Sequence, residues 1–133
     1  MSEKTIIENR CATLWFDEDK KIVHHAFHTV THGEQFQEIL ETGADLMEKH
    51  RAQKWLSDDR GNGALPAGDA DWAQTIWFPR VMRAGWKYWA LVQPEKIVGQ
   101  LNMKRFVSAY AEEGLTVRVF TQPEPALEWL RSQ

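Results

Sequence analysis

The chain has 133 residues, of which 43% are hydrophobic and 26% are charged, a composition typical of one folded domain over residues 1–133 and not of a disordered chain. Its net charge of −3 and its interspersed acidic and basic residues exclude nucleic-acid binding through a basic surface. No apolar run could span a membrane, the N-terminus lacks the apolar core of a signal peptide, and the single cysteine cannot form an intrachain disulfide, so we expect a cytoplasmic protein.

The first predicted elements are two antiparallel strands. A mostly apolar run over residues 12–17 leads into an acidic turn at residues 17–20, and residues 21–27 are rich in Val, Ile and aromatic side chains. Short runs of this kind on either side of a polar turn are typical of a β-hairpin. We therefore expect this segment to form the first two strands of a sheet.

A helix and a third strand follow the hairpin. Thr31 and Glu34 have the spacing of a capping box, and the apolar residues after them recur at helical intervals until Lys49, in a cationic stretch that suits a helix C-terminus. Residues 54–57 form a short apolar strand, and the Gly- and Pro-containing residues 57–68 are predicted to form a loop.

A second helix with an internal proline follows the loop. Asp69 or Asp71 is expected to cap its N-terminus, and Gly85 is a natural C-terminal cap. Pro79 lacks a backbone N–H and its ring clashes with the preceding turn of a helix, so we expect a kink at this position.

The C-terminal part predicts two more strands, each followed by a helix. Residues 86–92 form the fourth strand, residues 94–113 a helix, residues 115–120 the fifth strand and residues 121–130 the last helix. Strands that alternate with helices indicate parallel crossovers. The order ββαβαβαβα therefore predicts an α/β fold with a mixed, mostly parallel sheet of four to five strands and flanking helices.

Two short motifs accompany this order of elements. One follows the third strand and the other lies in the second crossover helix: Trp55-Leu56-Ser57-Asp58-Asp59-Arg60, and Trp77-Phe78-Pro79-Arg80 with Ala84-Gly85. With them, nearly the whole chain resembles the SpoIIAA-like family of bacterial, STAS-type domains. The resemblance implies helices on one main face of the sheet and a non-catalytic regulatory module. The best-known members are anti-sigma-factor antagonists that bind a protein kinase and are switched by phosphorylation of a serine, whereas related folds bind lipids or other small apolar ligands.

The chain departs from that family at the phosphoacceptor. The regulated members carry an Asp-Ser-Ser/Thr-Gly type of sequence after the third strand, where this chain has Asp58-Asp59-Arg60-Gly61. The nearest hydroxyl belongs to Ser57, which precedes the first Asp and ends the strand. We therefore do not carry the phosphorylation switch over to this protein.

Binding sites of parallel sheets collect beyond the carboxyl ends of the strands. The candidate ligand- or partner-binding residues at these ends are His28, Ser57, Asp58, Asp59, Arg60 and Gln93. Successive residues of an extended chain point to opposite sides, so Asp58 and Asp59 are not a ready acid–base pair. One of them can cap the loop while the other pairs with Arg60. Alternatively, the three residues form a polar patch that holds a partner loop or a ligand head group.

The pattern predicts no cofactor, no metal site and no catalytic residue. His24 and His28 would share one face of a strand, but at about 3.3 Å per residue they lie roughly 13 Å apart, too far for one ion. Cys11 has no neighbour that marks its thiol as activated, and the Gly-Asn-Gly of residues 61–63 lacks the Gly-Lys-Ser/Thr ending of a phosphate loop. Without a complete set of nucleophile, base and orienting group, an enzyme is the least favoured class.

The 7 tryptophans are too many for a small core to bury entirely. Trp72, Trp77 and Phe78 cover more than one side of their helix, so we expect one side to be exposed as an interface. The first predicted function is therefore a non-catalytic protein-interaction module that self-associates as a homodimer. The alternative is a domain that binds a small apolar ligand or lipid between the kinked helix and the Trp-rich fourth strand, with a polar mouth at residues 58–60.

Overall fold

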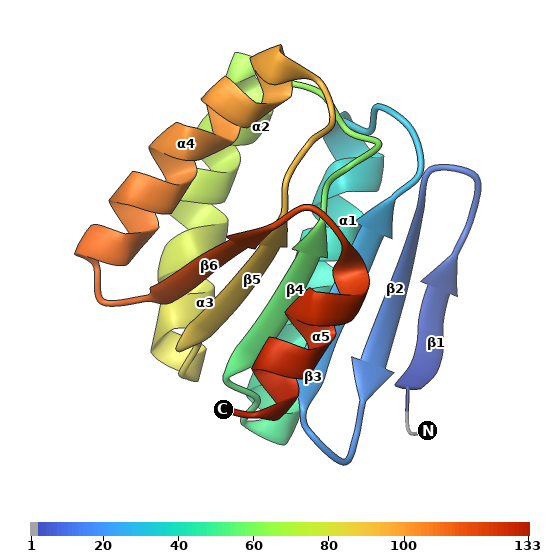
Figure 1. Ribbon diagram of the computed structural model, residues 1–133, viewed down its shortest axis with the longest axis vertical. Coiled ribbons are helices and arrows are strands. Elements are labelled where there is room, and N and C mark those ends of the chain that lie inside the picture. Colours follow the sequence, from blue (N-terminus) through green and yellow to red (C-terminus); the bar gives the residue numbers. More distant parts are fainter. Residues whose placement is uncertain (1–2) are drawn as a thin grey trace.

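Within residues 3–133, which are those that the computed structural model describes, six strands form one mixed sheet in the order of the chain (Figure 1). Their bounds are β1 (Glu3–Glu8), β2 (Ala12–Asp17), β3 (Ile22–Phe27), β4 (Lys54–Asp58), β5 (Tyr88–Val92) and β6 (Thr116–Phe120). The strands β1, β2 and β3 pair antiparallel, whereas β3 to β6 pair parallel. The predicted α/β class with a mixed, mostly parallel sheet is confirmed, with one strand more than expected.

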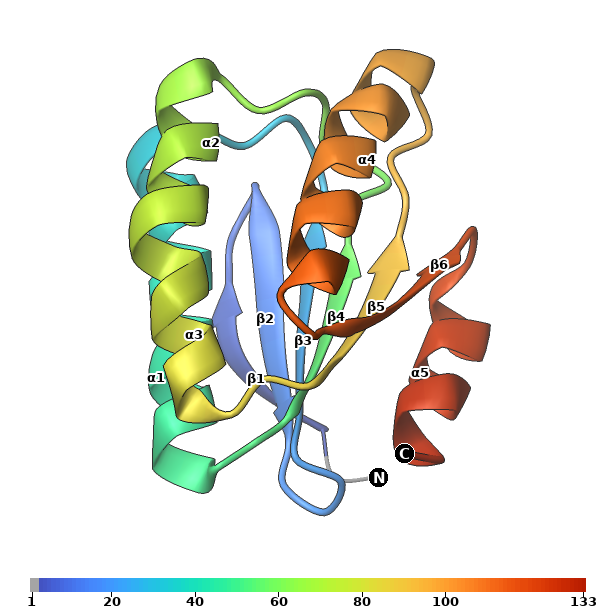
Figure 2. The same ribbon diagram turned by 90° about the vertical axis from the view of Figure 1, so that its left-hand side faces the viewer.

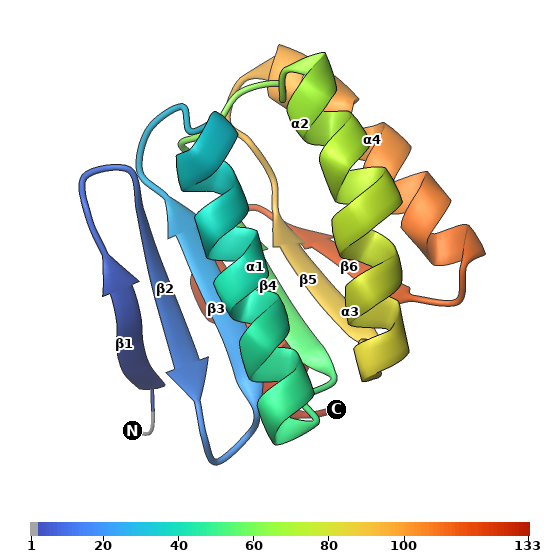
Figure 3. The same ribbon diagram turned by 180° about the vertical axis from the view of Figure 1, so that it is seen from behind.

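Helices cover both faces of the sheet, but unequally. Their bounds are α1 (Gly33–His50), α2 (Ala67–Trp72), α3 (Phe78–Ala84), α4 (Ile97–Glu112) and α5 (Pro123–Arg131), with a π-helical turn η1 (Ala73–Trp77) between α2 and α3. Parallel strands that pair in chain order and are joined by right-handed crossovers have every connecting helix on the same face. Accordingly, α1 to α4 lie on one face, here called the front face, and α5 lies on the other, the back face (Figure 2, Figure 3).

Alternation of side chains along the strands gives the sheet two hydrophobic cores. On β4, Trp55 packs in the front core and Leu56 in the back core beneath α5. The buried tryptophans of the front core are Trp55, Trp77, Trp86 and Trp89. The half-buried tryptophans are Trp15, Trp72 and Trp129. The expectation that the core does not bury every tryptophan is therefore confirmed.

The residue pattern does not predict β1. This strand lies at the edge of the sheet, and most of its side chains are exposed. Its pairing with β2 is irregular between Thr5 and Ile7, which interrupts the alternation of its side chains. The segment therefore lacks the regular period of two by which a half-buried strand is recognised in a sequence.

The predicted capping box of the first helix is wrong. No side chain of the preceding residue caps α1, and the hydroxyl of Thr31 donates instead to the carbonyl oxygen of Thr29, at 2.8 Å. The backbone N–H of Gly33 donates to Oδ2 of Asp69, at 2.9 Å. Asp69 was expected to cap its own helix, but that helix already begins at Ala67. The carboxylate thus ties the start of α1 to α2, two elements that flank the site described below.

Pro79 does not end its helix. The backbone stays helical from α2 through η1 into α3, and η1 lies immediately before the Phe78–Pro79 pair. A π-helical turn widens the helix by one residue, which makes room for a ring that would clash with the preceding turn. Where the sequence predicts a kink, the structure therefore has a π-helical turn.

The rest of this motif holds α3 against α1. The indole N–H of Trp77 donates to the carbonyl oxygen of Leu40, at 2.8 Å. The guanidinium of Arg80 donates two hydrogen bonds of 2.9 Å to Glu48 and also bonds Asp45. Arg80 holds the pKa of the Glu48 carboxyl below its usual value, chiefly through these hydrogen bonds. The motif therefore has a structural role between two helices.

Candidate functional site

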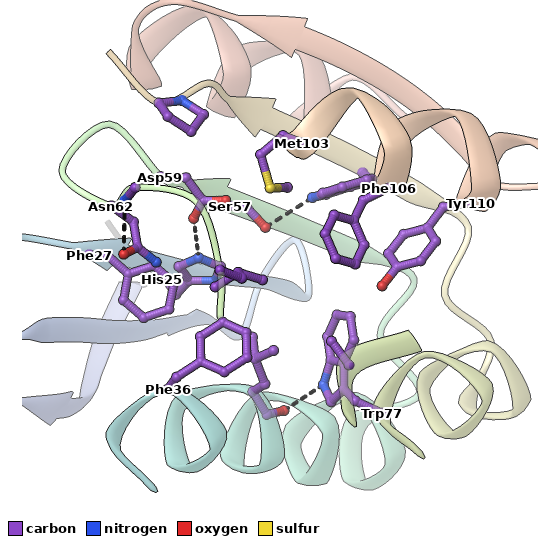
Figure 4. A pocket seen from close by; sticks show the side chains of 16 residues that line it. His25, Phe27, Phe36, Ser57, Asp59, Asn62, Trp77, Met103, Phe106 and Tyr110 are labelled. Atoms are coloured by element: carbon purple, nitrogen blue, oxygen red, sulfur yellow. Dashed lines mark hydrogen bonds and ion pairs between the residues drawn. The ribbon is translucent and has the colours of Figure 1, made fainter. Parts of the chain in front are cut away.

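The front face contains a narrow pocket between the sheet, α1, η1 and α4 (Figure 4). The pocket is open at its mouth, and its cavity volume is about 50 Å³. Its walls are mostly aromatic: Phe27, Phe36, Trp77, Trp89, Phe106 and Tyr110. Apolar walls and a small number of polar groups are usual features of a small-molecule site, whereas the volume lies below the roughly 300–1,000 Å³ of most such sites, so a ligand larger than a few atoms needs the lining side chains to move apart.

The polar groups of the pocket come from the ends of two neighbouring strands and the loop after them. His25 on β3 and Ser57 on β4 are paired in the sheet register, so their side chains lie side by side on the front face. Asp59 lies two residues after Ser57 and returns to the same face. Asn62 follows in the loop, where its Oδ1 accepts the backbone N–H groups of Thr31 and residue 63, at 3.0 and 3.1 Å. Local geometry therefore gathers four polar side chains at one end of an apolar space.

The tautomer of His25 follows from its neighbours. The indole of Trp55 can only donate, and its Nε1–H donates to Nδ1 of His25 at 3.0 Å. Nδ1 is therefore unprotonated, and the ring proton lies on Nε2, which donates to Oδ1 of Asp59 at 2.8 Å. The imidazole thus lies between a donor and a carboxylate, and His25 is only 3% exposed.

Two polar groups that line the pocket lack a full set of hydrogen-bond partners within the protein's described residues. Within residues 3–133, Oδ2 of Asp59 and the hydroxyl of Tyr110 have no hydrogen-bond partner, although Asp59 and Tyr110 are only 8% and 3% exposed. Burial raises the pKa of the Tyr110 hydroxyl, so this group stays protonated and can donate. Among the described residues, Nε2 of His24 is the one buried side-chain N or O atom without a partner, so these two oxygens are accessible from the pocket and can bond a bound molecule or water.

Ser57, His25 and Asp59 carry the residue types of a serine hydrolase, but not its geometry. Both ring nitrogens of His25 are already engaged, by Trp55 and by Asp59. The hydroxyl oxygen of Ser57 accepts the indole N–H of Trp89 at 2.9 Å and is not hydrogen-bonded to His25. A nucleophilic serine needs a base within hydrogen-bond reach, so this arrangement favours binding over acyl transfer.

The structure divides the predicted site residues between the two faces of the sheet. Ser57 and Asp59 line the pocket. Asp58 points to the back face, where Arg60 donates to both of its carboxylate oxygens at 2.9 Å. The prediction that residues 58–60 together form the polar mouth is therefore wrong. Successive side chains alternate between the faces, so only Asp59 lines the pocket, while Asp58 is paired with Arg60 outside it.

The other two predicted binding residues also lie outside the pocket lining. The exposed His28 forms a 2.7 Å hydrogen bond with the hydroxyl of Thr13. Gln93 is half-buried, and its backbone N–H donates to the carbonyl oxygen of Phe120. Neither side chain converges with Ser57 and Asp59.

The second crossover helix does not expose an aromatic side, contrary to the prediction from the sequence. Trp77 and Phe78 are only 6% and 4% exposed, and Phe78 stacks on Tyr110 with ring centroids 3.8 Å apart. Trp72 is half-buried, with its ring edge-on to Phe36. These aromatic residues cover several sides of the helix because the helix packs against α1 and α4 as well as the sheet. They do not form an exposed interface.

Several lining residues were not among the predicted ones: His25, Phe27, Phe36, Asn62, Phe106 and Tyr110. The sequence of β3 could have indicated His25 and Phe27, because alternation along the strand places both on the same face as the apolar Val23. A polar side chain on a core-facing position of a strand is informative in this way. No local pattern marks Tyr110, which reaches the pocket from the far end of α4.

Raising the pH above about 10, where an unfolded tyrosine ionises, is expected to lower the free energy of unfolding. A group whose pKa is raised in the folded protein stabilises the fold below its unfolded pKa, and that contribution is lost as the pH rises toward the folded pKa. Burial raises the pKa of Tyr110 in this sense. Urea denaturation at about pH 8 and about pH 11 measures the free energy of unfolding at each pH. Its decrease between the two pH values should be smaller in Tyr110→Phe than in the wild type.

The matched control for this titration is Tyr88→Phe, at a half-buried tyrosine on β5. It should lose stability as the wild type does. Lys54 acts in the opposite direction, because burial lowers its pKa and favours the folded state at high pH. Because the wild type and both tyrosine variants contain Lys54, its contribution cancels when their pH-dependent losses are compared. An equal loss in Tyr110→Phe and the wild type would show that the hydroxyl is solvated in the folded protein.

Comparison with known proteins adds no relative: no family model, no curated protein and no solved structure matches this chain. The resemblance to SpoIIAA-like domains therefore stays a prediction from element order and two motifs. Among residues 3–133, no helix is long and apolar enough to cross a membrane, and no three His, Cys, Asp or Glu side chains are grouped so that they could hold a metal ion.

Proposed function

We propose that this protein binds a small, largely apolar molecule in the front-face pocket. The observation that carries the proposal is the combination of aromatic walls with polar groups of Asp59 and Tyr110 that line the pocket and have no hydrogen-bond partner within residues 3–133. A ligand that hydrogen-bonds these groups replaces water there, and a hydrogen bond of this kind contributes about 0.5–1.5 kcal/mol net. A pocket that served only as core packing would place apolar side chains at these two positions.

The packing of α4 supports an entry route. The buried residues of α4 are Gly99 near one end and Tyr110 near the other. Between them, Phe106 lines both the pocket and a broader groove that runs between α2 and α4. Leu65 is also shared by the two spaces. The groove therefore adjoins the pocket, and we propose it as the entry route.

Filling the pocket is expected to weaken binding of N-phenylnaphthylamine, a neutral dye whose fluorescence rises in apolar sites. Ala73 lines the pocket and is 3% exposed, so Ala73→Met adds three heavy atoms to that space. We expect the dissociation constant of the dye to rise by about tenfold or more, the equivalent of about 1.4 kcal/mol. Fluorescence titration of the variant and the wild type measures this change, after circular dichroism has verified the fold.

Ala111→Met is the control, because Ala111 is exposed on α4 and does not line the pocket. It should bind the dye as the wild type does. The proposal fails if the wild type does not bind the dye, or if Ala73→Met binds it with unchanged affinity.

Self-association, as a non-catalytic interaction module, is a second candidate function. It is favoured by Ile97, Val98 and Leu101, which are 72%, 61% and 59% exposed at the N-terminal end of α4. Clustered exposed apolar side chains are typical of interaction surfaces, and this surface differs from the aromatic one expected from the sequence. Native mass spectrometry of gently purified protein separates the two candidates, since a dimer without bound mass favours self-association and a monomer with bound mass favours ligand binding.

A further inference from the structure

The pocket has a negative charge and no positive one. Asp59 is the only charged side chain among the described residues that line it, and no Lys or Arg does so. Arg105 lines the adjoining groove and not the pocket. In an enclosed apolar space a charge is poorly screened, so an anion placed beside Asp59 would be repelled without compensation.

His25 cannot neutralise this carboxylate by taking up a second proton without losing a bond. Its Nδ1 is the acceptor of the Trp55 indole N–H, and a proton there would leave two donors facing each other. One oxygen of Asp59 accepts from His25 and the other has no partner within residues 3–133. The free oxygen of Asp59 is therefore a hydrogen-bond acceptor that a donor group of the ligand can bond.

Asn62 adds a donor at the same end of the pocket. Because its Oδ1 accepts two backbone N–H groups, the orientation of its amide is fixed. Its NH₂ has no hydrogen-bond partner among the described residues, and Asn62 lines the pocket. A ligand head group that donates to Asp59 and accepts from Asn62, as a hydroxyl does, would satisfy both.

The walls favour a flat ring. Phe27 and Phe36 lie on one side of the pocket and Phe106 and Tyr110 on the other, with Trp77 below the second pair in the view of Figure 4. The space between them is narrow, and aromatic rings pack well against one another edge-on or with an offset. A planar aromatic ligand fits this shape better than a branched or saturated one.

We infer that the ligand of this pocket is a flat aromatic molecule, neutral or cationic, that donates an N–H or O–H hydrogen bond to Asp59, and that carboxylates and other anions are rejected. This inference rests on the proposed function and specifies the chemical class of its ligand. It excludes fatty acids and aromatic acids as occupants of the site.

Calorimetric titration with three matched naphthalenes tests the inference: naphthalenemethanol, naphthylmethylamine and naphthoate, substituted at the same ring carbon. The alcohol and the amine should bind at least about tenfold more tightly than the carboxylate. In Asp59→Asn the side-chain oxygen can still accept from His25 while the charge is removed. This variant should reduce the preference of the amine over the carboxylate by about tenfold or more.

Ala111→Met is again the control, because Ala111 is exposed on α4 and lies outside the pocket. It should leave the ratio of amine to carboxylate affinity unchanged. If naphthoate binds the wild type as tightly as the alcohol, or if Asp59→Asn leaves the ratio unchanged, the inference is overturned while dye binding still supports a ligand pocket. If neither the dye nor any naphthalene binds, the proposed function itself fails. Should Asp59→Asn not fold, the wild-type series decides alone.

Discussion

His25→Leu is expected to lower the free energy of unfolding by about 3–5 kcal/mol. The substitution leaves the carboxylate of Asp59 buried without its partner, and it also removes the acceptor of the Trp55 indole N–H. The indole N–H cannot recover its bond from solvent because Trp55 is completely buried, and the Asp59 carboxylate, at 8% exposed, has only the narrow pocket from which to take a replacement. Urea denaturation followed by circular dichroism and tryptophan fluorescence measures the change.

The adjacent histidine provides a matched control. His24 points to the opposite face of β3 and is 6% exposed. Its Nδ1 forms one 2.8 Å hydrogen bond with Glu3, and its Nε2 is buried without a partner. Since Glu3 is partly exposed and can be solvated, His24→Leu should change stability by no more than about 1 kcal/mol. Equal losses in the two variants would mean that the bonds of His25 do not stabilise the fold.

The fold could be predicted well from the sequence because its signals are local. The apolar run of β2, the acidic turn after it and Gly85 at the end of α3 each act over a few residues, and the structure confirms each. The cap of α1 could not be predicted, because Asp69 and Gly33 are 36 residues apart and meet through tertiary packing. Capping patterns describe neighbours in the chain and cannot detect such a partner.

The candidate site could be predicted only in part. Alternation correctly indicates that Asp58 and Asp59 point to opposite sides. It does not indicate the partner of each, since Asp59 pairs with His25, 34 residues away, whereas Asp58 pairs with Arg60, two residues away. The wall of the pocket opposite the sheet comes from α4, whose position depends on the whole fold. A binding site assembled between layers is therefore less visible in a sequence than the layers themselves.

Gly43→Ala is expected to destabilise the protein by about 2 kcal/mol, although alanine is the better helix former by about 1 kcal/mol. A methyl group on Gly43 of α1 would lie 2.8 Å from Cζ2 and Cζ3 of Trp55, and closer still to Cη2. Trp55 cannot move away, because its indole is bonded to His25 and packs against the rings of Trp77 and Trp86. Urea denaturation again measures the loss.

Gly68→Ala is the control for the change in helix propensity. Gly68 lies in α2, and a methyl group there meets nothing within 4 Å. This substitution should be neutral or stabilise the protein by up to about 1 kcal/mol. Destabilisation of both glycine variants to the same extent would exclude the contact with Trp55 as the cause.

A double-mutant cycle identifies the ring of Trp55 as the obstacle. Trp55→Phe alone should cost about 2–3 kcal/mol, because it leaves a cavity and an unpaired Nδ1 on His25. In the double variant the shorter ring makes room for the methyl group, so the combined loss should be smaller than the sum of the single losses by about 1–3 kcal/mol. Strictly additive losses would show that α1 shifts to accept the methyl group. In that case the front core would be soft at the helix that forms one wall of the pocket, and the pocket could not be rigid enough to select a flat ligand by shape.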